Sequence, residues 1–197
     1  MVPKQGSYSM FNMKMQNDRP SWIRPVSSGP MGQVDSCLVD KINLLDIIEI
    51  EVTEECPSGF QSENVLFDPK SLRVIKKVPA KDIYLNRLVD QKQTLLFNSD
   101  SHAISVSDIS KLSYSLTFIK PSSWRFVLVD GKHEQTRCIF SYANHTYDLP
   151  ITDIDFCNDY KKNPLLVEKI MQLYLTISLG MVFEGKHYKL VAGVISY

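Results

Sequence analysis

The sequence predicts a mainly β protein with short helices, an α+β chain whose second half forms a small antiparallel Greek-key barrel. Two alternating, β-rich runs at residues 173–180 and 181–195 indicate a closing hairpin with Gly180 and Gly185 in its turn. Residues 112–150 contain further short alternating segments, and a polar, helix-like stretch at residues 153–169 precedes the final pair. Short strands with one helix before the last two are typical of a closed barrel rather than an open sheet.

Composition limits the class of protein without naming its chemistry. The 197 residues are 44% hydrophobic and 22% charged, which is typical of a folded protein of one or two domains. The formal net charge is zero, so binding of nucleic acid would need a local patch rather than a basic surface. The four cysteines are widely separated, which favours reduced thiols over a zinc site or a disulfide framework.

Residues 1–20 have no sustained period and predict an irregular N-terminal arm. A first strand follows, in which Trp22, Arg24 and Val26 share one face and Pro25 marks an edge or a strand end. A tryptophan beside a guanidinium can stack on a base and hold a phosphate. The alternative interpretation is a core tryptophan with the arginine lying over it.

The rest of the first half, residues 21–105, alternates strands and loops. Residues 44–52 predict a strand whose Ile48, Ile50 and Val52 face inward. The loop at residues 56–68 then places amides and a carboxylate close together, at Gln61, Glu63 and Asn64. These groups could read a base edge or sugar hydroxyls, or they could satisfy local backbone groups. A strand at 71–78, a helix at 79–90 and a short helix at 105–111 follow.

The second half, residues 106–197, is more regular. Strands are expected at residues 112–119, 124–130, 137–143 and 146–150, with turns at 120–122, 130–132 and 144–145. Together with the helix-like stretch and the closing hairpin they describe an OB-like barrel. The half therefore resembles a binding scaffold more than a catalytic one.

No common catalytic pattern is present: the sequence has no GxGxxG, GxxxxGK[ST], HExxH or GxSxG motif. The histidines stand alone in predicted turns and loops. Four carboxylates at Asp148, Asp153, Asp155 and Asp159 would bind a hard cation if they converged, but an acidic loop before a helix explains them as well. We therefore predict no cofactor, no metal and no catalytic residue.

Basic and aromatic residues alternate in the second half, as in Trp124-Arg125-Phe126, in Arg137 with Tyr142, and in residues 186–189. OB-folds commonly hold single-stranded nucleic acid with such pairs. Tyr188 and Lys189, however, fall on opposite faces of a regular strand. They can reach one ligand only if a bulge intervenes.

Three ordered segments resemble the dual OB-containing domain family of bacteria. They are the strand Trp22 to Ser27 (WIRPVS), the Leu45-Asp46-Ile47 stretch with the Gln61 to Asn64 loop (QSEN), and the ending YLTISLG at 174–180 with YKLVA at 188–192. The resemblance runs from Ser21 to the end of the chain. It implies two OB-like antiparallel Greek-key barrels and a nucleic-acid- or nucleotide-binding role, in a bacterial defence or mobile-element setting.

The sequence and the resemblance together predict a non-enzymatic binding module for single-stranded nucleic acid or a nucleotide. The expected contact residues are Trp22, Arg24, Ser27, Gln61, Glu63, Asn64, Tyr188 and Lys189. Two alternatives stay open: a protein–protein interaction module, and a metal-dependent nuclease or nucleotide-processing enzyme in which Glu63 and the carboxylates at 148–159 converge. No apolar run approaches ~20 residues, so we expect no membrane span and a cytoplasmic protein.

Overall fold

The computed structural model describes residues 21–28, 32, 34–40, 42–90, 93–130 and 134–197. By its contacts the chain forms two compact units, the first ending at Pro79 and the second beginning at Ala80. Residues 80–105 thus group with the second unit, whereas the sequence assigns them to the first half. The predicted arm at residues 1–20 lies outside the described residues.

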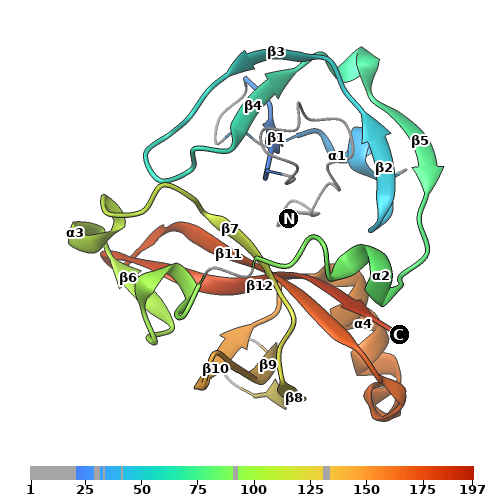
Figure 1. Cartoon of the computed structure of the whole chain (residues 1–197), viewed down its shortest axis with the longest axis vertical. Helices are drawn as coiled ribbons and strands as arrows, with labels where there is room; N and C mark the ends of the chain where they lie inside the picture. The colour runs from blue at the N-terminus through green and yellow to red at the C-terminus, as the bar shows by residue number, and fades with distance from the viewer. Residues whose placement is uncertain (1–20, 29–31, 33, 41, 91–92, 131–133) are drawn as a thin grey trace. The chain divides into compact units, whose positions relative to one another are not determined.

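The first unit is built from short strands around a small curved sheet (Figure 1). Strands β1 (Arg24–Val26), β4 (Asn64–Phe67) and β3 (Val52–Glu55) form one sheet, and β2 (Asp46–Glu49) pairs antiparallel with β5 (Arg73–Lys77). The pair β1–β4 is parallel, an exception to the antiparallel pairing expected. Two short helices, α1 (Ser36–Val39) and the 3₁₀ turn η2 (Pro69–Ser71), complete the described elements.

The predicted strand at 44–52 is interrupted between β2 and β3, and its inward pattern holds only in part. Ile48 is buried, as predicted, but Val52 is 45% exposed. The prediction for Val52 was wrong because the expected strand is divided in two: β2 ends at Glu49 and pairs with β5, whereas β3 begins at Val52, pairs with β4 and is exposed along its length.

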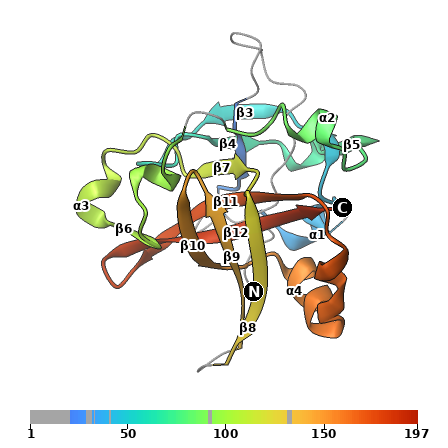
Figure 2. The same ribbon diagram turned by 60° about the horizontal axis from the view of Figure 1, so that its bottom comes forward.

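The second unit contains two sheets that share a continuous core (Figure 2). Strands β8 (Ser123–Val129), β9 (Gln135–Tyr142) and β10 (His145–Pro150) form an antiparallel meander. The second sheet has the order β6 (Ala103–Ser105), β12 (Lys186–Ser196), β11 (Leu173–Phe183), β7 (Leu116–Ile119). A parallel bridge from Ile151 to Val191 joins the two sheets where β10 ends.

This order is that of a five-stranded Greek-key barrel. The first barrel strand is divided into β7 and β8, β9 and β10 are the second and third, and β11 and β12 are the fourth and fifth. Helix α4 (Ile154–Lys162) stands between the third and fourth strands, as the sequence predicts. Helix α4 ends at Lys162 because Asn163 precedes Pro164, and a residue before proline is disfavoured in the α conformation. The 3₁₀ helix η4 (Pro164–Lys169) follows. The second half is therefore the predicted OB-like barrel.

The remaining helices are shorter than the sequence indicates. Helix α2 (Asp82–Leu85) is a single turn inside the predicted helix at 79–90, and it begins three residues after Pro79. Helix α3 (Val106–Ile109) is capped by the Ser105 side chain, within the predicted 105–111. A 3₁₀ turn, η3 (Leu96–Asn98), was not predicted. Among the described residues no helix combines the length and the apolar character needed to span a membrane.

The closing hairpin is the predicted one, but its turn is tighter. The turn residues are Glu184 and Gly185, both with positive φ, as a type I′ turn requires. Gly180 lies inside β11, so its assignment to the turn was wrong. A shift in register between Leu179 and Val182 places an extra residue of β11 opposite Tyr188, which is a β-bulge. All seven residues from Leu173 to Leu179 are buried, so this hairpin is the centre of the second core.

Candidate functional site

The predicted site residues of the first unit do come together. Strand β1 pairs with β4 so that Arg24 lies beside Asn64, and the Arg24 backbone N–H donates to Glu63 O at 2.6 Å. The WIRPVS strand and the QSEN loop, 34 or more residues apart in the sequence, are thus neighbours. Trp22 and Ser27, at the two ends of this strand, are half-buried.

The charged members of this group form a buried ion pair. Arg24 Nη2 lies 3.5 Å from Glu63 Oε1, and their side chains are only 13% and 4% exposed. Burial lowers the pKa of the Arg24 guanidinium, and the neighbouring charge of Glu63 opposes that shift. A guanidinium held this way joins two strands, which agrees better with the structural interpretation than with a phosphate contact.

The amides of the loop are also engaged locally. Asn64 Nδ2 donates to Gln61 Oε1 at 3.3 Å, and the backbone of Gln61 exchanges two hydrogen bonds with Ser58. Asn64 Oδ1 is buried and accepts no hydrogen bond within the described part of the chain. These amides satisfy groups of their own loop, which agrees with the second of the two roles considered from the sequence.

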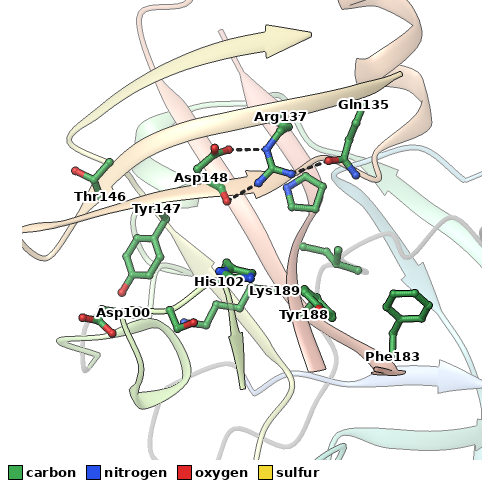
Figure 3. A pocket seen from close by; sticks show the side chains of 13 residues that line it. Asp100, His102, Gln135, Arg137, Thr146, Tyr147, Asp148, Phe183, Tyr188 and Lys189 are labelled. Carbon is green, nitrogen blue, oxygen red and sulfur yellow. Dashed lines mark hydrogen bonds and ion pairs between the residues drawn. The ribbon is translucent and has the colours of Figure 1, made fainter. Parts of the chain in front are cut away.

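A pocket of about 730 Å³ opens on the second unit, across β9, β10 and β12 (Figure 3). Polar and aromatic side chains line it. The lining residues are Asp100, Ser101, His102, Gln135, Arg137, Thr146, Tyr147, Asp148, Pro150, Phe183, Tyr188, Lys189 and Leu190.

The pocket lies where OB-folds bind ligands. These barrels use the face of their second and third strands together with the loop between strands four and five. Here the second and third strands are β9 and β10, and Phe183 directly precedes the turn between β11 and β12. The position follows from the topology and does not depend on any single side chain.

One wall carries a network centred on Arg137 (Figure 3). Its Nε donates to Asp148 Oδ1 at 2.7 Å, Nη2 to Asp148 O at 2.8 Å, and Nη1 to Gln135 Oε1 at 2.6 Å. Three of the five guanidinium N–H donors are therefore used inside the protein. The network fixes a cation, a carboxylate and an amide side by side at the rim of the pocket.

Aromatic rings form another part of the lining. The Tyr188 ring lies 5.8 Å from the His102 ring and 6.2 Å from that of Phe183, measured between centroids. Phe183 is 63% exposed, and Tyr188 is half-buried. Exposed rings at the edge of a pocket offer faces on which a planar ligand can stack.

Lys189 lines the same pocket but is fully buried. Its Nζ donates to Ser99 O at 2.6 Å and lies 5.2 Å from the centre of the Tyr147 ring. Burial lowers the pKa of the ammonium to about 8, against the charge of Asp100. Tyr188 and Lys189 border one pocket beside the β-bulge that the sequence argument required, but Lys189 supports its wall.

Sequence reasoning missed most of this pocket. Arg137 stood out only through its alternation with Tyr142, and Asp148 only as one of four carboxylates. The signal was the tight reversal near Asn144, since an antiparallel hairpin folded there brings residues 137 and 148 to the same end of two strands. His102 and Phe183 carry no comparable signal.

The carboxylates at 148–159 serve separate tasks. Asp148 holds Arg137, Asp153 caps α4 and accepts from Val194 N, and Asp159 lies 4.0 Å from Lys162. Within the described ranges, no group of three or more His, Cys, Asp or Glu side chains is arranged to hold a metal ion.

Comparison with known proteins agrees with the barrel topology. A family model described as a dual OB-containing domain matches residues 4–194, nearly the whole chain. No curated protein and no solved structure gives a significant match. Since one model spans both compact units, the chain belongs to the dual OB-containing domain family.

Proposed function

We propose that the protein is a non-enzymatic binding module that holds single-stranded nucleic acid, or a nucleotide, in the pocket of its second barrel. One observation carries the proposal: the pocket covers the second and third barrel strands and reaches the turn between the last two. Membership of the dual OB-containing domain family supports a binding role in general.

The lining favours a ligand with a planar ring. His102, Phe183 and Tyr188 supply aromatic faces, and a base stacked on such a ring contributes about 1 to 3 kcal/mol. The charged lining residues are Arg137 and Lys189 against Asp100 and Asp148, which balance when histidine is neutral. Stacking, rather than attraction to phosphates, is therefore the main source of affinity that we propose.

In this proposal the first unit does not form the contact surface for the ligand. Trp22, Arg24 and Ser27 lie on or beside β1, next to the Gln61 to Asn64 loop, and the ion pair from Arg24 to Glu63 is buried between them. A ligand that contacts this group would meet mainly half-buried side chains. We expect substitutions here to change stability more than affinity.

The test is binding of fluorescent 12-nucleotide single-stranded DNA, single-stranded RNA and mononucleotides, followed by anisotropy. The expected result is saturable binding of at least one probe that Tyr188→Ala weakens about tenfold. The matched control is Tyr84→Ala, which removes a tyrosine that is 42% exposed on α2 and does not line the pocket. Absence of binding to every probe, or an equal effect of both variants, would overturn the proposal.

A protein partner is the second candidate function. The end of β11 exposes three consecutive apolar side chains, with Met181 at 76%, Val182 at 55% and Phe183 at 63%. A salt-insensitive complex with a protein, in the absence of oligonucleotide binding, would favour this candidate.

The cytoplasmic location and the bacterial defence or mobile-element setting stay predictions. The neighbouring genes would test the setting, and cell fractionation would test the location.

A further inference from the structure

We infer that the pocket selects guanine, by matching the hydrogen-bonding edge of that base to the group formed by Asp148, Arg137 and Gln135. This inference rests on the proposed function and specifies its ligand. Some polar atoms of this group are hydrogen-bonded within the protein, and the inference follows from those that remain available to a ligand.

The carboxylate of Asp148 has acceptor capacity to spare. Oδ1 accepts one hydrogen bond, from Arg137 Nε, and Oδ2 accepts none from the described residues. A carboxylate offers about four acceptor positions, so three remain. The Asp148 side chain is 53% exposed and lines the pocket, so these positions are open to a ligand.

Two neighbouring groups have donors to spare. Arg137 uses three of its five N–H groups, which leaves one on Nη1 and one on Nη2. Gln135 accepts from Arg137 through Oε1, so its amide is oriented and its NH₂ group points elsewhere. The wall therefore presents an anionic acceptor beside oriented donors (Figure 3).

Guanine complements this arrangement best among the bases. Its pairing edge carries two adjacent donors, N1–H and N2–H, next to the O6 acceptor, so a carboxylate can accept both donors while Arg137 or Gln135 donates to O6. Adenine and cytosine each offer one donor group on that edge. Thymine and uracil place acceptors on both sides of a single N–H, which would set carbonyl oxygens against the carboxylate.

The charge of the wall also favours a base over a phosphate. Arg137 is neutralised by Asp148 at 2.7 Å, and Lys189 is buried with its Nζ on Ser99 O. A phosphate placed here would lie next to the Asp148 carboxylate. The neutral edge of a base meets no such repulsion.

The experiment compares 12-nucleotide oligo-dT probes that carry one central dG, deoxyinosine, dA, dC or dT. We expect the dG probe to bind about tenfold more tightly than oligo-dT, because a bidentate pair discriminates bases by that order. Deoxyinosine lacks the N2 amino group and should fall between the two. This comparison changes only the ligand, so it does not depend on how a variant folds.

Asp148→Asn then tests the assigned residue. We expect this variant to lower the preference for dG, measured as the ratio of its affinities for the dG probe and for oligo-dT, to less than about threefold. The matched control, Asp100→Asn, removes the other carboxylate of the pocket and should keep the preference. Equal binding of all five probes, or equal loss in both variants, would overturn the inference and leave the proposed function standing. Failure of these probes and of the RNA and mononucleotide probes to bind would instead reject the proposed function.

Discussion

Lys189 holds both ends of the segment from Ser99 to His102. Its Nζ donates to Ser99 O at 2.6 Å, and its backbone N–H donates to His102 O at 2.9 Å. The segment carries Asp100, Ser101 and His102 to the rim of the pocket. One fully buried residue on β12 therefore positions a wall of the pocket that lies about 90 residues earlier in the sequence.

The first prediction concerns the pH dependence of stability. Because the pKa of Lys189 is about 8 in the folded chain and near 10.5 when unfolded, the unfolded chain binds more protons between these values. The free energy of unfolding should therefore rise from pH 8 to about 10.5 through this residue. Urea denaturation should show that the free energy of unfolding of the wild type increases relative to that of Lys189→Met over this range. Lys186→Met, which alters an exposed lysine on the same strand, should show no such gain.

The second prediction concerns Asp82, which joins α2 to the end of the chain. Asp82 Oδ1 accepts from the hydroxyls of Tyr174 and Tyr197 and from Lys120 Nζ. These hydrogen bonds, that from Tyr174 first, lower the pKa of Asp82 to about 2. Its stabilising contribution is complete above the unfolded value of 3.8 and is lost as the pH falls toward 2.

Asp82→Asn should therefore lower the thermal midpoint at pH 6 and have a smaller effect near pH 2. Asp159→Asn is the control, since that side chain is 67% exposed and its lysine partner is 4.0 Å away. A destabilisation by Asp82→Asn of the same size at both pH values would contradict the prediction.

The third prediction tests the buried ion pair of the first unit. Arg24→Ala should destabilise the protein by about 3 kcal/mol, because it leaves the Glu63 charge in a buried site without its arginine. Arg73→Ala breaks the exposed pair with Glu49, where the arginine is 68% exposed, and should cost less than about 1 kcal/mol. Chemical denaturation measures both. Loss of oligonucleotide affinity by folded Arg24→Ala, with stability unchanged, would move the contact surface to the first unit.

The fourth prediction concerns the turn of the closing hairpin. Gly185 has a φ of +73°, so Gly185→Val should cost about 1 to 2 kcal/mol and should also weaken ligand binding, since Phe183 and Tyr188 flank this turn. Gly59→Val is a matched control, because Gly59 has a φ of +57° and lies in the first unit. It should reduce stability to a similar extent without changing affinity. An equal change in affinity would contradict the assigned role of the turn.

The parts of the fold that depend on a local period were predictable. The second half alternates polar and apolar residues, so strands β8 to β12, the reversal at residues 144–145 and the position of α4 follow from the sequence. The predicted turn at 130–132 lies largely outside the described residues. Val52 could not be placed, because the alternation continues across residues 50–51 while the chain passes from the sheet of β2 to that of β3, whose residues are all exposed. Gly180 could not be assigned to a strand, because nothing local distinguishes a bulge glycine from a turn glycine.

The candidate site was less predictable than the fold. The neighbourhood of Arg24 and Glu63 was anticipated, but their burial was not, since burial depends on what packs around them. Conversely, Arg137, Asp148 and His102 come from three segments whose meeting is decided by the barrel topology. Tyr188 is the predicted residue that both lines the pocket and offers an accessible ring.

The division of the first barrel strand at Lys120, Pro121 and Ser122 has a consequence for evolution by insertion and deletion. Pro121 cannot donate to a ladder, and there the chain leaves β11 as partner and takes β9. Adding or removing one residue inside β8 would turn the side chains beyond it to the opposite face, and Phe126 would leave the core. The link at residues 120–122 lies outside both strands, so a change of length is tolerated there better than a few residues further along the chain.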